Sequence, residues 1–130
     1  MRSTTKFLFL LCVILLTACG PGKPGDAFQK YSKEAMEGDY EDGSRYFCVD
    51  GNPLNFRQDS LLQVVLKGYY ADMEEKFQGL KKTEVVDQQV QDGGQRADIR
   101  VRLYFGDGTE EETEYEMCLV ENKWKINLLE

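Results

Sequence analysis

The chain offers few side chains for acid–base or nucleophilic chemistry. Its 130 residues include no histidine, which excludes Ser-His-Asp and Cys-His catalysis as well as histidine-ligated metal sites. A proton-transfer site would instead need a buried carboxylate as the base, with tyrosines or a protonated acid as donors to an oxyanion. Glu84 is the one carboxylate that the strand pattern nominates as that base. The alternative is that Glu84 lies near a strand end with its carboxylate in water.

If the fold leaves a pocket between helices and sheet, the sequence predicts which residues would line it. Alternation along the predicted strands places Glu84, Gln88 and Thr113 on the side of the sheet that faces the helices. Aromatic side chains of the same region would add apolar surface. The candidate pocket-lining residues are Tyr69, Met73, Glu84, Gln88, Thr113 and Tyr115.

The acidic run "GDGTEEETE" at residues 106–114 could suggest a calcium site. A calcium loop, however, needs carboxylates that a turn brings together around one ion. Here the glutamates of the run alternate along the outer face of a predicted strand, where Arg100 and Arg102 partly pair with them. We therefore predict a solvated face, no metal site and no cofactor.

The N-terminus has the pattern of a removable leader. "MRSTTK" supplies two cations, an apolar run of ten residues follows at 7–16, and "TAC" ends the segment, as in a secretory signal. Ten apolar residues are too few to span a bilayer, where about 20 are needed. We predict a signal peptide at residues 1–18, a Gly/Pro tether that begins with Cys19 at residues 19–25, and one domain at residues 26–130.

The residues Leu16-Thr17-Ala18-Cys19 resemble the lipobox of bacterial lipoproteins. The resemblance implies a cut before Cys19, lipid on its thiol, and acylation, for example by palmitate. Two or more acyl chains bind a membrane stably, so the membrane is the first expected partner. Gly20 and the lack of a following acidic run resemble Gram-negative lipoproteins of the outer membrane that face the periplasm. The alternative is an ordinary signal peptide with an incidental cysteine.

Cys48 and Cys118 remain once Cys12 leaves with the leader and Cys19 takes lipid. Two remaining cysteines often pair in an oxidising compartment, and the long closed loop would contribute up to ~4 kcal/mol. Strand alternation opposes the pair, because it places Cys118 on the charged face of the sheet, away from the helices. Pairing requires the chain around Cys48 to run along the edge of that sheet. Both outcomes stay open, and we do not expect the two cysteines to bind a metal.

The charge balance limits the partners. The net charge is −7, and removal of residues 1–18 takes away Arg2 and Lys6, which leaves 14 basic against 23 acidic side chains. Nucleic-acid binding needs clustered Lys and Arg, and an anionic lipid surface does not attract an acidic domain. We therefore expect no nucleic-acid partner, and a membrane attachment that is covalent or hydrophobic.

Hydrophobic periodicity predicts helices in the first half of the domain. A first helix follows Asp26 as its N-cap, and a short second helix covers residues 40–47. A third helix begins at Asn55, where Gln58 completes a capping box, and ends at Gly79. Its expected apolar stripe consists of Leu62, Val65, Leu66, Tyr69, Met73 and Phe77.

After Leu80 the period of the pattern changes from 3.6 to 2. Four strands are predicted, at residues 82–91, 96–105, 111–120 and 123–129, and the last turn is the dipeptide Glu121–Asn122. The expected pairs across the second hairpin are Ala97–Leu119, Ile99–Met117, Val101–Tyr115, Leu103–Thr113, Arg100–Glu116 and Arg102–Glu114. Those across the third are Met117–Ile126 and Leu119–Trp124. The predicted fold class is α+β, a roll of about three N-terminal helices packed on a four-stranded antiparallel meander.

Four stretches resemble a family of small bacterial lipoproteins of unknown function: "DAFQKYSKEAMEGDYEDGSRYF", "GLKKTEV", "RADIRVRLYFGDGTEEET" and "NKWKINL". That family is assigned to the nuclear transport factor 2-like (cystatin-like) superfamily. The likeness covers nearly all of residues 26–130. It implies a cone-shaped roll in which three helices pack into a curved sheet, sometimes with a pocket between them. The superfamily includes isomerases, dehydratases and non-catalytic domains, so the fold does not determine the function.

Three functions agree with these observations. The leading expectation is a non-catalytic envelope lipoprotein domain that binds a small apolar ligand or a protein partner. The second is a small isomerase- or dehydratase-like enzyme that uses Glu84 with a tyrosine. The third is a structural envelope subunit that forms a homodimer through its sheet, as many members of the superfamily do. The alternating Arg and Glu on the outer sheet face argue against that last arrangement.

Overall fold

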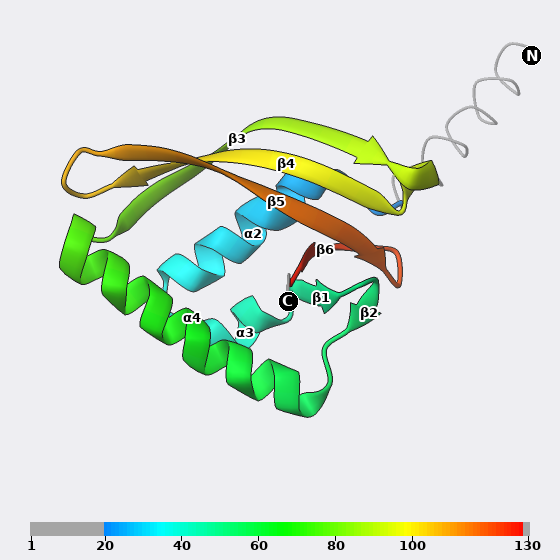
Figure 1. Cartoon of the computed structure of the whole chain (residues 1–130), viewed down its shortest axis with the longest axis horizontal. Helices are drawn as coiled ribbons and strands as arrows, with labels where there is room; N and C mark the ends of the chain where they lie inside the picture. Colours follow the sequence, from blue (N-terminus) through cyan, green and yellow to red (C-terminus); the bar gives the residue numbers. More distant parts are fainter. Residues whose placement is uncertain (1–19, 129–130) are drawn as a thin grey trace, which may run out of the picture.

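A computed structural model describes residues 20–128 of the chain, so the predicted signal peptide and Cys19 lie outside the described residues. Within this range, helices gather on the inner side of a curved sheet (Figure 1). The helices are α2 Pro24–Met36, α3 Tyr40–Ser44 and α4 Phe56–Phe77, and a short 3-10 helix, η1, covers Asp92–Gly94. The strands are β1 Phe47–Val49, β2 Asn52–Pro53, β3 Leu80–Gln91, β4 Arg96–Phe105, β5 Glu110–Val120 and β6 Lys123–Asn127. No described helix is long and apolar enough to cross a membrane.

Helix α2 begins earlier than the sequence predicted. Lys23 is the N-cap residue and makes no side-chain cap, Pro24 occupies the first turn, and Asp26 lies inside the helix. The prediction of Asp26 as N-cap was therefore wrong, because proline fits the first helical position, where an N–H is unpaired anyway. Pro24 and Gly25 are buried, so the tether ends before residue 24.

Helix α3 starts at the predicted residue but ends earlier than expected, and α4 starts at its predicted cap. The Asp39 side chain accepts a hydrogen bond from the N–H of Asp42, and α3 ends at Ser44 because the chain then enters β1. At α4 the predicted capping box between Asn55 and Gln58 is present, with both hydrogen bonds formed. The helix ends where Gln78 and Gly79 both take positive φ, which confirms the predicted C-terminus.

The sheet has six strands within the described residues, in the order β2-β1-β6-β5-β4-β3. The prediction of a four-stranded antiparallel meander was incomplete. Its four strands are present as β3 to β6, but the turn-rich stretch after residue 46 forms a small hairpin, β1–β2. Strand β1 runs parallel to β6, with Phe47 opposite Ile126, so the sheet is mixed. Strands of two and three residues carry no readable periodicity, which is why the sequence missed them.

The register between β4 and β5 differs from the prediction by two residues. Ala97 lies opposite Met117, and Arg100 opposite Glu114. The turn decides this: the N–H of Phe105 donates to the carbonyl of Thr109 at 3.0 Å, and Gly108 takes φ +90° inside a short tight loop. A two-residue slip keeps every side chain on its predicted face, and the predicted register between β5 and β6 is confirmed.

A disulfide joins Cys48 in β1 to Cys118 in β5, with the two Cα atoms 6.9 Å apart. Both strands are neighbours of β6 in the sheet, and the pair lies with Val120 in a small buried cluster separate from the main core. The chain around Cys48 does run along the sheet, as this pairing requires. Strand alternation alone could not show it, because β1 was not recognised as a strand.

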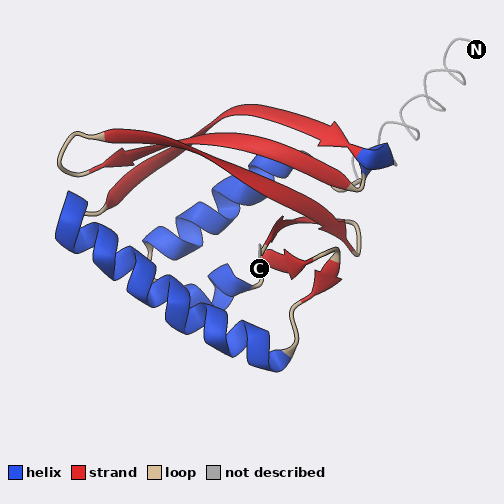
Figure 2. Cartoon of the chain, viewed as in Figure 1, coloured by secondary structure: helices blue, strands red, loops and turns tan. Residues whose placement is uncertain are grey.

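The main core lies between α2 and the sheet. The long strands β3, β4 and β5 lie on one side of α2 and α4 (Figure 2), and α2 crosses the inner face of the sheet while α4 closes the roll from the far side (Figure 1). The most deeply buried large side chains of this core include Phe28, Ile99, Val101 and Met117. A face of α2 rich in aromatic residues therefore holds the inner face of β4 and β5.

Candidate functional site

The residues predicted to line a pocket between helices and sheet do not lie around one cavity in the structure. Met73 is 5% exposed and belongs to the core, and the Tyr115 ring packs on that of Phe28, with centroids 4.9 Å apart. Thr113 points inward but is only half-buried. Tyr69 is 46% exposed on α4. These side chains build the core or reach its edge, so they do not converge on one cavity.

Glu84 lies on the opposite face of the sheet from the one predicted. In the register of β3 and β4, Glu84 lies opposite Arg102, and its neighbour Thr83 faces inward opposite Leu103. β-Bulges near Leu80–Lys82 and Val85–Asp87 shift the alternation of β3, and the prediction had assumed an uninterrupted strand. Glu84 does contact a tyrosine, because the hydroxyl of Tyr104 donates to it at 3.1 Å. That pair is on the outer face, so the arrangement predicted for a catalytic Glu84 is absent from the described structure.

Gln88 faces the helices as predicted, and it has a structural partner. Its side-chain oxygen accepts the N–H of Gly25 at 2.9 Å, one of the N–H groups that the first turn of a helix leaves unpaired. A Cβ at residue 25 would lie 2.9 Å from this oxygen and 3.0 Å from Val85. Gly25 therefore allows α2 to begin directly against β3.

Two tyrosine hydroxyls meet inside the roll. Tyr31 on α2 and Tyr70 on α4 form a hydrogen bond of 2.9 Å. Burial raises the pKa of Tyr70 to about 12 and raises that of Tyr31 further. Burial also raises the pKa of Tyr115. All three phenols stay neutral near pH 7, where they can share hydrogen bonds but supply no charge.

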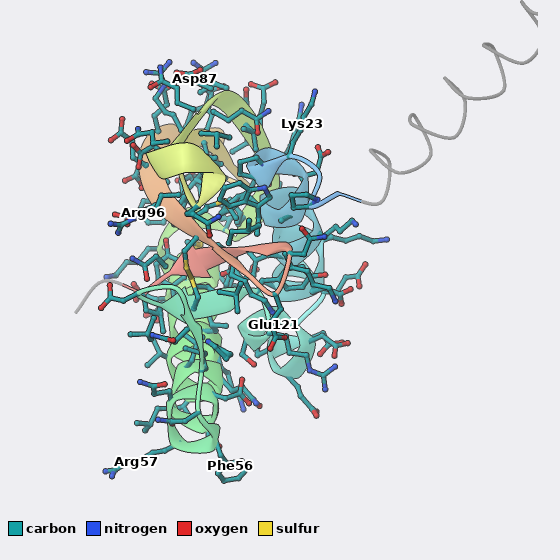
Figure 3. All side chains as sticks on the ribbon, turned by 90° about the vertical axis from the view of Figure 1, so that its right-hand side faces the viewer. Lys23, Phe56, Arg57, Asp87, Arg96 and Glu121 are labelled. Atoms are coloured by element: carbon teal, nitrogen blue, oxygen red, sulfur yellow. A yellow bond between two sulfur atoms is a disulfide. The ribbon has the colours of Figure 1, made fainter. Side chains whose placement is uncertain are left out.

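A groove of about 670 Å³ lies outside the roll, where the N-terminal segment passes α2 and β6. Residues 20–23 form one wall, and α2, the end of α3 and the start of β6 form the rest. Tyr46 contributes aromatic surface. Trp124 also lines the groove but is only 5% exposed, and its indole N–H donates to the carbonyl of Gly22 at 3.2 Å. Figure 3 views the side of the molecule that carries Lys23 and the β5–β6 turn at Glu121.

The charge of this groove is opposite to that of the whole chain. Five basic and three acidic side chains line it, in a protein of net charge −7. Arg45 pairs with Asp42 at 2.9 Å, and the ammonium of Lys125 donates to the carbonyl of Arg45. Burial and the neighbouring Lys123 lower the pKa of Lys125.

Three further lysines of the groove are unpaired. Lys23, Lys30 and Lys123 form no ion pair with any residue between 20 and 128. Their ammonium groups are available to a ligand that carries negative charge.

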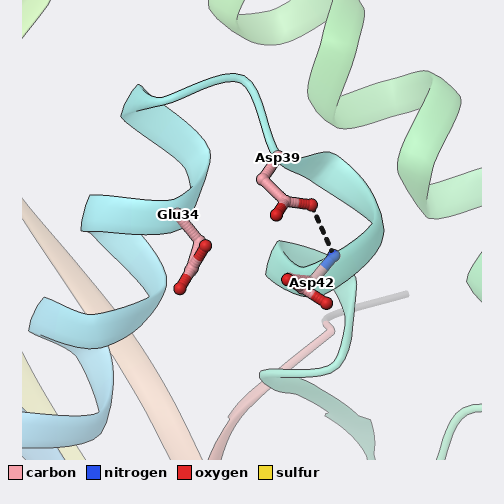
Figure 4. Close-up of side chains that lie close together, drawn as sticks. All are labelled: Glu34, Asp39 and Asp42. Carbon is pink, nitrogen blue, oxygen red and sulfur yellow. Dashed lines mark hydrogen bonds between the residues drawn. The ribbon is translucent and has the colours of Figure 1, made fainter.

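An acidic cluster stands at the edge of the same region. Glu34, Asp39 and Asp42 each offer a carboxylate oxygen, and these oxygens lie within 4.8 Å of one another (Figure 4). A hydrogen bond with Asp39, and then its negative charge, raises the pKa of Asp42. Asp39 also caps α3, and Asp42 also pairs with Arg45. The fold therefore uses these carboxylates to fix α3 and its connection to α2.

Sequence reasoning missed the groove. Its lysines come from three separate segments, Lys23 before α2, Lys30 on α2 and Lys123 at the start of β6. None of them forms a motif along the chain. The available signal was weak: the chain holds 16 basic against 23 acidic residues, and two of the lysines flank its one tryptophan.

One family profile and two solved structures are similar to this chain. The profile of a family described as "Domain of unknown function (DUF4878)" matches residues 17–127. A Campylobacter jejuni crystal structure, described as a candidate nuclear transport factor 2-like transpeptidase, aligns with a TM-score of 0.63 and 16% identity over 82% of this chain and 98% of that one. The intermembrane space region of the chloroplast protein ARC6 aligns with a TM-score of 0.41 and 17% identity, over 81% and 88%. No curated protein matches the chain. The Campylobacter jejuni structure shows that the domain has the nuclear transport factor 2-like fold, and at 16% identity the likeness carries no activity.

Proposed function

The chain belongs to the DUF4878 family of domains of unknown function, and from this premise we propose that it is a non-catalytic binding domain of the bacterial cell envelope. Its groove beside the N-terminal segment takes an acidic segment of a protein partner. The observation that carries the proposal is the set of three unpaired lysines around Trp124 and Tyr46 in an otherwise acidic molecule.

A protein partner suits this groove better than a small apolar ligand does. The interior of the roll, where an apolar ligand was expected, holds packed side chains such as Phe28 and Tyr115. The groove is open and carries both charged and aromatic groups, as the rim and the anchor points of protein interfaces do. An acidic segment would place carboxylates on the lysines and an apolar side chain against Tyr46, the partly exposed aromatic residue of the groove.

The proposed anchor places this groove close to a membrane. We propose that Cys19 carries lipid and holds the domain at the outer membrane, on its periplasmic side. Lys23 follows Cys19 by four positions, a distance of at most about 14 Å even when the chain is fully extended. Gly20, Pro21 and Gly22 themselves form a wall of the groove. A partner in the groove would therefore sit directly beside the bilayer surface.

Photo-cross-linking in cells tests the proposal. A photoreactive amino acid at Lys30 should give a cross-linked protein, and the same group at Lys82 is the matched control, because Lys82 lies on the outer sheet face over the Tyr104 ring. The Lys30 product should disappear when Lys23 and Lys123 are changed to Glu, since the partner would then meet repelling charges. Identical products from both positions, or a Lys30 product that survives the charge reversal, would contradict the proposal.

A further inference from the structure

Helix α4 has apolar side chains on two opposite faces. Leu62, Leu66 and Met73 are buried against the rest of the roll. On the other side, Leu61, Val64 and Val65 are 58%, 71% and 62% exposed. A helix that is apolar on both sides generally has something to bury its second face against.

The outer face follows the spacing of a coiled-coil seam. Its central line is Arg57, Leu61, Val64, Gly68, Ala71 and Glu75, with steps of four, three, four, three and four residues, and all six are exposed. This alternation of three and four is the spacing at which two helices pack side by side along their length.

The seam is complementary to itself when it is reversed. An antiparallel copy places Arg57 opposite Glu75, and Leu61 opposite Ala71. It also places Val64 opposite Gly68. Each pair then joins a cation to an anion, or a large apolar side chain to a small residue, and the twofold symmetry makes each pair occur twice. We propose that α4 packs antiparallel against α4 of a second copy of this chain.

Gly68 supports the pairing independently of the charges. A glycine inside a helix costs about 1 kcal/mol relative to alanine, and Gly68 lies inside α4 without positive φ. A Cβ at this position would meet nothing within 4 Å, so packing within one copy does not require a glycine. The close approach of Val64 from a second helix does.

The dimer leaves the groove open. In Figure 3, Arg57 at the beginning of α4 and Lys23 beside the groove lie at opposite ends of the molecule. Each copy contributes a single helix of 22 residues, about 33 Å long, and the extent of association depends on protein concentration.

Homotypic cross-linking measures this contact on the full chain extracted in mild detergent. The two copies of Lys67 lie on the same side of the pair, offset along the axis by only about 3 Å. A link between Lys67 and Lys67 can form only between two copies, so it reports the dimer directly. The matched control is Lys76, whose two copies are offset by about 30 Å, beyond the reach of a short amine-reactive reagent. We expect the Lys67–Lys67 link and not the Lys76–Lys76 link.

Charge reversal tests the register. Arg57→Glu alone and Glu75→Arg alone should each reduce the Lys67–Lys67 link about ten-fold, because like charges then face each other twice. The double variant Arg57→Glu/Glu75→Arg should restore it. Gly68→Leu should abolish the link while it maintains or raises thermal stability, and this separates a blocked interface from a misfolded chain.

Three results would overturn the proposal. The first is absence of the Lys67–Lys67 link in the unmodified chain at any concentration. The second is a link that neither Gly68→Leu nor the single charge reversals reduce, which would assign the contact to another surface. The third is a double variant that fails to regain the link.

Discussion

The interior of the roll and the groove outside it differ in whether their polar side chains have partners within the protein. Inside, Tyr31 and Tyr70 bond to each other, and Thr83 bonds to Ser32 at 2.8 Å. Every buried side-chain nitrogen or oxygen in residues 20–128 has a partner. In the groove, three lysines remain without an ion pair in the same residues. Satisfied polar groups stabilise a fold, whereas unpaired charges around aromatic surface leave interactions for a ligand.

This comparison predicts that changes inside the roll alter stability and leave partner binding intact. Phe28→Ala is the strongest case, because Phe28 is 2% exposed and a buried phenylalanine contributes about 3–5 kcal/mol. Urea unfolding should show that loss. The proportion of folded protein cross-linked from Lys30 should stay unchanged, and its loss would place part of the binding site inside the roll.

The disulfide provides the next largest effect. Cys48 and Cys118 are 70 residues apart in sequence, and closing a loop of that length contributes about 2–4 kcal/mol on the chain-entropy account. The double variant Cys48→Ser/Cys118→Ser should unfold at correspondingly lower urea. The single variant Cys48→Ala is the control. Because it breaks the same disulfide, it should lose the same amount of unfolding free energy as the double variant. Unchanged stability in both would show that the bond contributes nothing to the fold.

High pH should lower the free energy of unfolding, because a buried phenol of the interior ionises. Tyr70 has a pKa of about 12 in the folded chain, above its ordinary value of 10.0. Its contribution is therefore complete below pH 10 and is lost as pH rises from 10 to 12, because the unfolded chain releases its phenol proton first. Tyr70→Phe should remove that pH dependence, because it removes the titrating phenol, and should cost about 1 kcal/mol at pH 7 through the lost hydrogen bond to Tyr31. An unaltered pH profile in this variant would contradict the assignment.

The groove variants should show the smallest change in stability and the largest change in binding. Lys30→Glu and Lys123→Glu alter groups without an ion pair, so the free energy of unfolding should change by less than about 0.5 kcal/mol. Cross-linking to the partner should nevertheless be lost. A stability loss as large as that of Phe28→Ala would mean that these lysines belong to the fold.

Local chemistry made much of the fold predictable from the sequence. The capping box at Asn55, the turn at Glu121–Asn122 and the four long strands each depend on neighbouring residues, and the structure has them. The fold class followed from them, whereas the nuclear transport factor 2-like architecture was implied by the family resemblance. The stripe on α4 was only partly correct, because Val65 and Tyr69 are exposed.

The candidate site depended on features that local patterns do not encode. Glu84 lies on the other face of the sheet than predicted, because bulges in β3 interrupt the alternation of its side chains. The sheet gained β1 and β2, which are too short to show a period. The groove arises where residues 20–23 pass β6, about a hundred positions away in the sequence. Long-range placement of this kind follows from tertiary packing rather than from any segment alone.

Mass spectrometry of the full protein, extracted from its own membranes in mild detergent, tests the central claim most directly. The denatured mass reports lipid on Cys19, and the native mass reports whatever is bound. We predict that a protein partner accompanies the unmodified chain and the interior variant Tyr115→Phe, and is absent from Lys30→Glu/Lys123→Glu. Retention of the partner by the groove variant, or a small apolar ligand that only Tyr115→Phe releases, would show that the interior is the binding site.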